Sequence, residues 1–92
     1  MLISLDEAKL YLRLDHDEDD DFILTLINAA EELCADVARI PAEEIPEKNS
    51  SNVRVAMLYT IAYLYEHREE ADHHDLALTL RALLFGIREA AF

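Results

Sequence analysis

One run of apolar residues limits what this chain can fold into more than any other feature. Between Val55 and Tyr65 only Thr60 is polar, so a helix built from this run has no face that water would solvate well. The run is too short to cross a membrane, which takes roughly 20 apolar residues, and the charged segment 66–70 follows it directly. We therefore expect a central helix that is enclosed by other parts of the chain, with cover by other copies left open.

The remaining composition also favours helix. The 92 residues include one glycine and two prolines, and no repeated strand-and-turn pattern is visible. We predict a single all-α domain over residues 1–92, a small four-helix domain with a central, almost wholly apolar third helix. A chain of this size has a marginal core, so association with other copies is a plausible source of additional burial.

Apolar spacing and capping residues place the first two helices. Ser4 and Glu7 have the spacing of a capping box, which predicts a short helix from about Leu5 to Leu12. Lys9 and Arg13 are expected on the exposed side of this helix. A second helix of roughly Asp20 to Ala38 follows from apolar residues that recur at helical spacing.

Two prolines and several polar residues separate the second helix from the central one. The second helix should end near Ile40-Pro41, because the residue before a proline avoids the helical region. Residues 42–52 are predicted to be a polar surface linker, held in place by Ile40 and Ile45. The central helix then runs to about Arg68 or Glu70. A polar break at 71–75 precedes a last apolar helix, which ends or bends near Gly86.

The charge of the chain is strongly negative and uneven. Twenty acidic and eight basic residues give a net charge of −12, and residues 1–48 alone hold fourteen acidic and four basic residues, a net −10. Such a surface repels the phosphates of nucleic acids, which argues against a protein that grips or reads DNA. The same repulsion is useful where DNA must move past without sticking.

Neither acidic nor histidine-rich segments form a convincing metal site. The acidic run 15–21 lacks the glycine of a calcium loop, and Leu26 stands where the closing glutamate should be. His73 and His74 are adjacent and point in different directions, without a second spaced pair to complete a tetrahedral set. We expect no metal, and we expect His67 to stack on Tyr63 or hydrogen-bond near it.

Residues that would support catalysis are also missing. The single cysteine, Cys34, lies on an apolar helical face and is predicted to be a buried core residue. Serines occur only at helix starts and in the linker, and one glycine cannot build a phosphate-binding loop. We expect no catalytic residue and no cofactor. Because the N-terminus shows no signal peptide or lipidation motif, we expect the protein to stay in the cytosol where it is made.

Three segments, in this order along the chain, resemble the head–tail connector family of long-tailed phages and prophages. The segments are Leu2–Asp21, Phe22–Glu32 and Ala62–Glu69, and Leu84–Arg88 resembles the end of that family more loosely. The resemblance covers nearly the whole chain. It implies a structural subunit, without enzymatic activity, of a ring in the virion neck.

The resemblance also implies partners. Connectors of this kind form a ring of about a dozen copies, in which each copy presents two different complementary patches. The ring is expected to sit between the portal protein and a downstream neck or tail-completion protein. DNA would pass through its hole without specific binding, and no membrane is involved.

Two groups of residues are candidates for these roles. Buried phenols need hydrogen-bond partners, so tyrosines in the apolar run favour a partly wet or inter-subunit position. The predicted subunit or portal interface comprises Tyr59, Tyr63, Tyr65, Glu66, Arg68, Glu69 and Phe92. The predicted channel-facing acids are Asp15, Asp17, Glu18, Asp19, Asp20 and Asp21.

An alternative class of function is a small acidic regulatory binder. A DNA mimic, or an inhibitor that occupies a basic site, would also be a small helical domain with a net charge of −12. That function predicts tight, salt-sensitive binding to a basic partner rather than to portal or tail proteins. An enzyme is the third alternative, and it would need a cavity with convergent polar groups.

Overall fold

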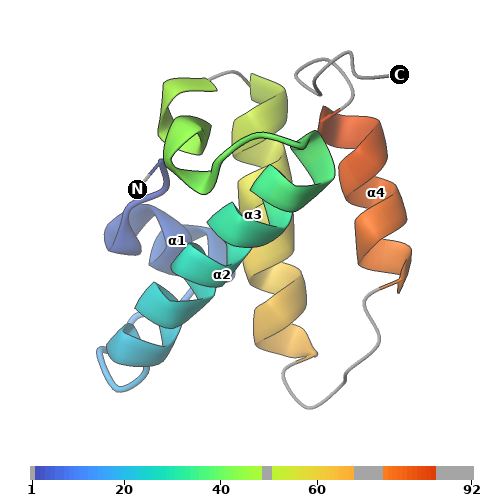
Figure 1. Cartoon of the computed structure of the whole chain (residues 1–92). Coiled ribbons are helices and arrows are strands. Elements are labelled where there is room, and N and C mark those ends of the chain that lie inside the picture. The colour runs from blue at the N-terminus through green and yellow to red at the C-terminus, as the bar shows by residue number, and fades with distance from the viewer. Residues whose placement is uncertain (1, 49–50, 68–73, 85–92) are drawn as a thin grey trace.

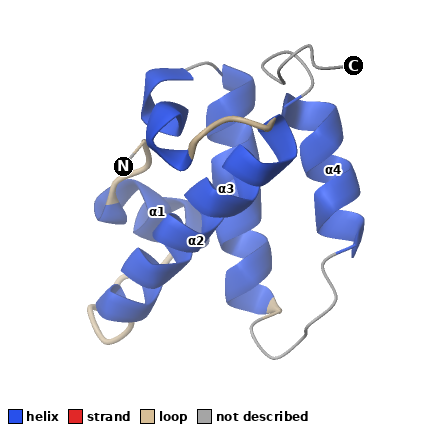
Figure 2. Cartoon of the chain, viewed as in Figure 1, coloured by secondary structure: helices blue, strands red, loops and turns tan. Residues whose placement is uncertain are grey.

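The computed structural model describes residues 2–48, 51–67 and 74–84, and this part of the chain contains helices and loops without a strand (Figures 1 and 2). The elements, in order, are α1 (Leu5–Leu12), α2 (Asp20–Ala38), the 3₁₀ helix η1 (Ala42–Lys48), α3 (Ser51–Glu66) and α4 (His74–Leu84). The all-α prediction is confirmed. The predicted bounds of the first two helices coincide with those of α1 and α2.

The segment predicted as a polar linker is more ordered than expected. Residues 42–48 form η1, and Ile40 and Ile45 are buried on either side of its start. Those two isoleucines were expected to hold the segment in place, and their burial explains why a polar, proline-containing stretch folds back onto α2. The sequence prediction was therefore right about the attachment and wrong about the absence of regular structure.

Both α1 and α2 end on an arginine in the left-handed conformation. Arg13 has φ 60° and Arg39 has φ 61°, a region in which glycine is the usual occupant. After each arginine the next residue donates a backbone hydrogen bond into the last helical turn: Leu14 to the Lys9 carbonyl at 2.9 Å, and Ile40 to the Ala35 carbonyl at 3.1 Å. These bonds satisfy carbonyls that the end of a helix would leave without a partner.

The start of α1 is capped, but not by a full capping box. The Ser4 hydroxyl accepts a hydrogen bond from the Glu7 backbone N–H at 3.1 Å, as predicted. The Glu7 carboxylate, however, forms an ion pair with Arg54 instead of returning to the cap. This pair joins α1 to α3 across the sequence.

The core lies between α2, α3 and α4, and α1 closes one end of it (Figure 1). Helix α3 packs against α1, α2 and α4. The largest fully buried side chains come from all parts of the chain: Ile3, Ile23, Ile27, Ile45, Met57, Ile61, Leu76, Leu80 and Leu84. Leu76, Leu80 and Leu84 recur every fourth residue, which is the spacing that places one face of α4 against α2 and α3.

One polar side chain lies within this core. Thr60 is fully buried, and its hydroxyl donates to the Ala56 carbonyl at 2.7 Å, one turn earlier in α3. Its oxygen also lies 3.8 Å from the Cys34 sulfur of α2. Because the hydroxyl hydrogen is used on Ala56, Thr60 acts as the acceptor for the thiol. Cys34 is buried as predicted, and burial raises the pKa of its thiol to about 11.

Helix α3 is not enclosed on every side by its own chain. Its buried face contains Val53, Met57 and Ile61, whereas Val55 is 51% exposed and Tyr59 is 38% exposed. Leu10 of α1 is a further exposed apolar side chain, at 78%. Apolar character along these helices therefore exceeds what the subunit itself buries.

Some sequence predictions fall outside the described residues. Helix α3 ends at Glu66, slightly before the expected Arg68 or Glu70, and residues 68–73 and 85–92 are not described. The predicted interface residues Arg68, Glu69 and Phe92 and the bend at Gly86 therefore lie outside the described ranges. The predicted break at 71–75 includes the first two residues of α4, which begins at His74.

Two valines on α3 test whether only one side of this helix packs against the rest of the subunit. Val53→Ala removes two buried methyl groups and leaves a cavity, so it should lower the free energy of unfolding by about 2 kcal/mol. Val55→Ala, two residues later on the open side, should change the free energy of unfolding of the subunit by less than about 0.5 kcal/mol. Urea denaturation followed by circular dichroism measures both. Equal losses for the two variants would contradict the one-sided packing of α3.

Burial of Cys34 makes a second prediction. At pH 8 the native chain should react with a small thiol reagent far more slowly than the chain unfolded in guanidinium, because the thiol is both inaccessible and protonated. Leu10→Cys supplies the control, since that position is 78% exposed and its thiol should react quickly in the folded chain. Native and unfolded chains that react at similar rates would contradict a buried Cys34.

Candidate functional site

The acidic loop between α1 and α2 is held by a single lysine. The Lys9 ammonium lies 2.6 Å from an Asp17 oxygen and 2.8 Å from an Asp20 oxygen. The side chain of Lys9 is 14% exposed, so the prediction that it lies on the open side of α1 is wrong. Its hydrogen bonds to Asp17 and Asp20 raise the pKa of Lys9, and the same ammonium lowers the pKa of Asp17.

This lysine divides the predicted channel-facing acids into two groups. Asp17 and Asp20 are partners of Lys9, although the Asp17 side chain remains 88% exposed. Asp19 is half-buried, and its backbone carbonyl accepts the Ile23 N–H at 2.8 Å where α2 begins. Asp15, Glu18 and Asp21 are exposed on the loop and the first turn of α2. Within the described residues no group of three or more potential ligands could hold a metal ion.

The three tyrosines predicted at the interface have different environments. Tyr63 stacks on His67, with ring centroids 4.1 Å apart and an interplanar angle of 15°, as the sequence predicted for His67. The Tyr65 ring lies against Phe22 of α2 at 6.3 Å. Both are half-buried, whereas Tyr59 is exposed. Of the three, Tyr59 is the one that presents its ring to solvent.

Tyr59 belongs to a row of residues that we call the α3 stripe. Val55, Tyr59, Ala62 and Glu66 recur at intervals of four, three and four residues, so they lie along one side of α3. This side is opposite the face that carries Met57 and Thr60 into the core. The stripe is apolar for most of its length and ends at the exposed carboxylate of Glu66. The last turn of α3 contains no basic residue to offset that charge.

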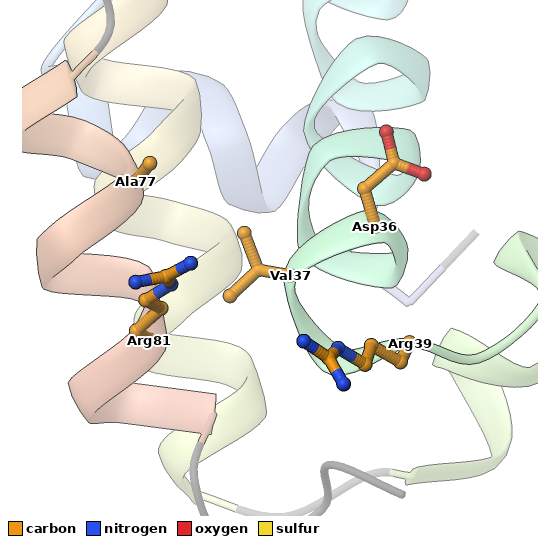
Figure 3. Close-up of a pocket in the computed structure, with 5 residues that line it drawn as sticks. All are labelled: Asp36, Val37, Arg39, Ala77 and Arg81. Atoms are coloured by element: carbon orange, nitrogen blue, oxygen red, sulfur yellow. The ribbon is translucent and has the colours of Figure 1, made fainter. Parts of the chain in front are cut away.

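A pocket of about 260 Å³ opens between the C-terminal end of α2 and the side of α4. It is lined by Asp36, Val37, Arg39, Ala77 and Arg81 (Figure 3). Val37 and Ala77 contribute its apolar part. Figure 3 shows Val37 and Arg81 facing each other between the two helices, with Arg39 at the lower edge and the Asp36 carboxylate turned up along α2. We call this the α2–α4 pocket.

The two arginines reach the pocket for different local reasons. Arg39 is the left-handed residue that ends α2, and Arg81 lies in the last turn of α4. Both positions are at the negative end of a helix dipole, where a cation is favourable. Arg39 was not recognised as a candidate from the sequence. The available signal was its position directly before Ile40-Pro41, where the helix had to end.

The ion pairs of Lys9 with Asp17 and Asp20 make a pH-dependent prediction. Lys9→Met keeps most of the alkyl chain and removes the charge, so it should lower the urea midpoint at pH 7. The folded pKa of Asp17 is depressed, so the stability that it contributes is present above its unfolded value near 3.8 and is lost as the pH falls through the folded value. The difference between the two chains should therefore shrink at pH 2.5. Asp15→Asn, an exposed acid in the same loop, is the control, and a difference independent of pH would show that Lys9 acts only through packing.

Comparisons with known proteins bear on what these surfaces do. Residues 2–89 match the model of a family described as Phage gp6-like head-tail connector protein, whose members are structural rather than enzymatic. The comparisons with curated proteins and with solved structures gave no match. Among the described residues no helix is both long and apolar enough to span a membrane. Because the match extends over almost all of the chain, the protein belongs to the phage gp6-like head–tail connector family.

Proposed function

We propose that this protein is the repeating subunit of a ring that joins the phage portal to the tail, and that DNA passes through the ring when packaging is completed and during ejection. The observation that carries the proposal is the family match over residues 2–89. A structural role in the head–tail connection follows from the family itself. The ring and the passage of DNA through it are what we propose in addition.

The partners follow from the position of such a ring. About a dozen copies would form a closed circle with head-to-tail contacts, so that each copy uses two different surfaces toward its neighbours. One side of the ring would contact the portal protein, and the other a downstream neck or tail-completion protein. The subunit would be made in the host bacterial cytoplasm and would end in the virion neck.

The surfaces of the fold support a subunit that associates. Val55 and Tyr59 are exposed on the central helix, where a lone subunit gains nothing from apolar side chains. We assign Tyr59 and Glu66 to a contact with a neighbouring copy or with the portal, with Tyr63 and Tyr65 supporting them from within the fold. Arg68, Glu69 and Phe92 remain sequence-based members of the same interface.

The acidic run suits a surface that DNA passes. We propose that Asp15, Glu18 and Asp21, together with the exposed Asp17 and the half-buried Asp19 and Asp20, face the channel. Repeated around a ring, these carboxylates form a negative wall that repels the phosphates of DNA. Binding of DNA to such a wall would stall its movement, so the absence of specific contacts is part of the function.

Electron microscopy and mass measurement on single particles test the proposal. The purified chain, alone or mixed with the portal protein of the same phage, should form rings with a central hole. At low salt these rings should not retain double-stranded DNA. A chain that stays monomeric alone and with the portal would contradict the proposal, as would a pull-down dominated by a basic host protein instead of portal and tail proteins.

A further inference from the structure

Ring formation by this chain has an electrostatic cost. Each copy carries a net charge of −12, so bringing copies together is opposed unless cations lie at the contact. Two of the described cations are used inside the subunit: Lys9 binds Asp17 and Asp20, and Arg54 binds Glu7. Cations that remain available on the surface are therefore the ones to examine for contacts between copies.

Arg39 and Arg81 are such cations, and they share one pocket. Neither forms an ion pair with any residue that the structure describes, and both line the α2–α4 pocket. The Asp36 carboxylate in the same lining is turned away from them in Figure 3. Two guanidinium groups beside the apolar side chains of Val37 and Ala77 suit a carboxylate that arrives with apolar neighbours.

Glu66 is a carboxylate of that kind. It is exposed at the last residue of α3, where the helix dipole disfavours a negative charge, and the last turn holds no base. Within the described ranges it has no ion pair or hydrogen bond through its side chain. A cation supplied by another molecule would remove this unfavourable arrangement. The rest of the α3 stripe, Val55, Tyr59 and Ala62, provides the apolar neighbours.

We propose that the α2–α4 pocket receives the α3 stripe of a second copy of this chain, with Glu66 of that copy held between Arg39 and Arg81. The inference rests on the proposed ring and names the two surfaces that meet in it. Pocket and stripe share no residue, so every copy can offer its stripe to one neighbour and its pocket to the other. Contacts of this type run head to tail and close into a ring when the rotation between copies allows it.

Charge exchange tests the pairing. Arg81→Glu places a carboxylate opposite Glu66, and Glu66→Arg places a third guanidinium at the pocket. Either change alone should raise the concentration needed for ring assembly at least about tenfold, because each leaves like charges facing each other. The chain that carries both changes should assemble again, and so should an equal mixture of the two single variants.

Control variants separate the pairing from net charge. Arg13→Glu makes the same charge change as Arg81→Glu on an exposed residue outside the pocket, and Glu47→Arg matches Glu66→Arg on η1. Both controls should assemble like the unaltered chain. Circular dichroism spectra and urea midpoints of all the variants show whether any loss of assembly is a loss of folding.

The outcomes distinguish failure of the pairing from failure of the ring. If the unaltered chain forms rings and the single variants do so equally well, the pairing is overturned and the ring stands. Folded single variants that fail to assemble, and are not restored by the double exchange or by mixing, also overturn the pairing. If Arg81→Glu prevents only portal binding, the pocket belongs to the portal contact and the inference is wrong. An unaltered chain that never assembles, even with the portal, overturns ring and pairing together.

Discussion

The packing of α3 on one side only is the constraint on which the rest of the structure depends. Its buried face brings Val53, Met57 and Ile61 against α1, α2 and α4, and this contact holds the three other α-helices together. The opposite side carries Val55 and Tyr59, which remain 51% and 38% exposed. One helix thus supplies both the core of the domain and an apolar surface that favours association.

Charge is distributed in a way that agrees with this division. Lys9 and Arg54 form ion pairs with acids of the same subunit, Lys9 in the acidic loop and Arg54 with Glu7. Arg39 and Arg81 lie instead at helix ends beside an open pocket. Excess negative charge opposes association in general, so the few cations that remain on the surface restrict where two copies can meet. In an acidic protein, the placement of its bases therefore gives specificity more than affinity.

Much of the fold could be predicted from local patterns. The Ser4 cap, the acidic start of α2 and the Ile40-Pro41 stop fixed the ends of α1 and α2, because capping depends on neighbours in sequence. Burial of Cys34 followed from its place on an apolar helical face, and burial of Ile45 followed from its being an apolar residue in a polar segment. The family could be recognised for the same reason, since the segments that carry the resemblance are continuous in the sequence.

The remaining features depend on contacts between distant residues. Lys9 was predicted to be exposed from its position on the helix alone. Its two partners, Asp17 and Asp20, become its neighbours only when the loop turns back over α1. Leu10 is apolar and lies within the first helix, yet it is 78% exposed. The pocket is lined by residues about forty positions apart, on α2 and α4, so no local sequence pattern predicts it. Arg54, which binds Glu7, stands directly before the apolar run, and its partner lies on another helix far away in the sequence.

The left-handed backbone of Arg39 has a consequence for how such proteins diverge. Glycine adopts this conformation at least as readily as arginine, so the two residues can replace each other here without disturbing the end of α2. The exchange would add or remove the guanidinium group alone. Exchange at this turn would therefore change the charge beside the α2–α4 pocket, while the fold of the subunit stays as it is.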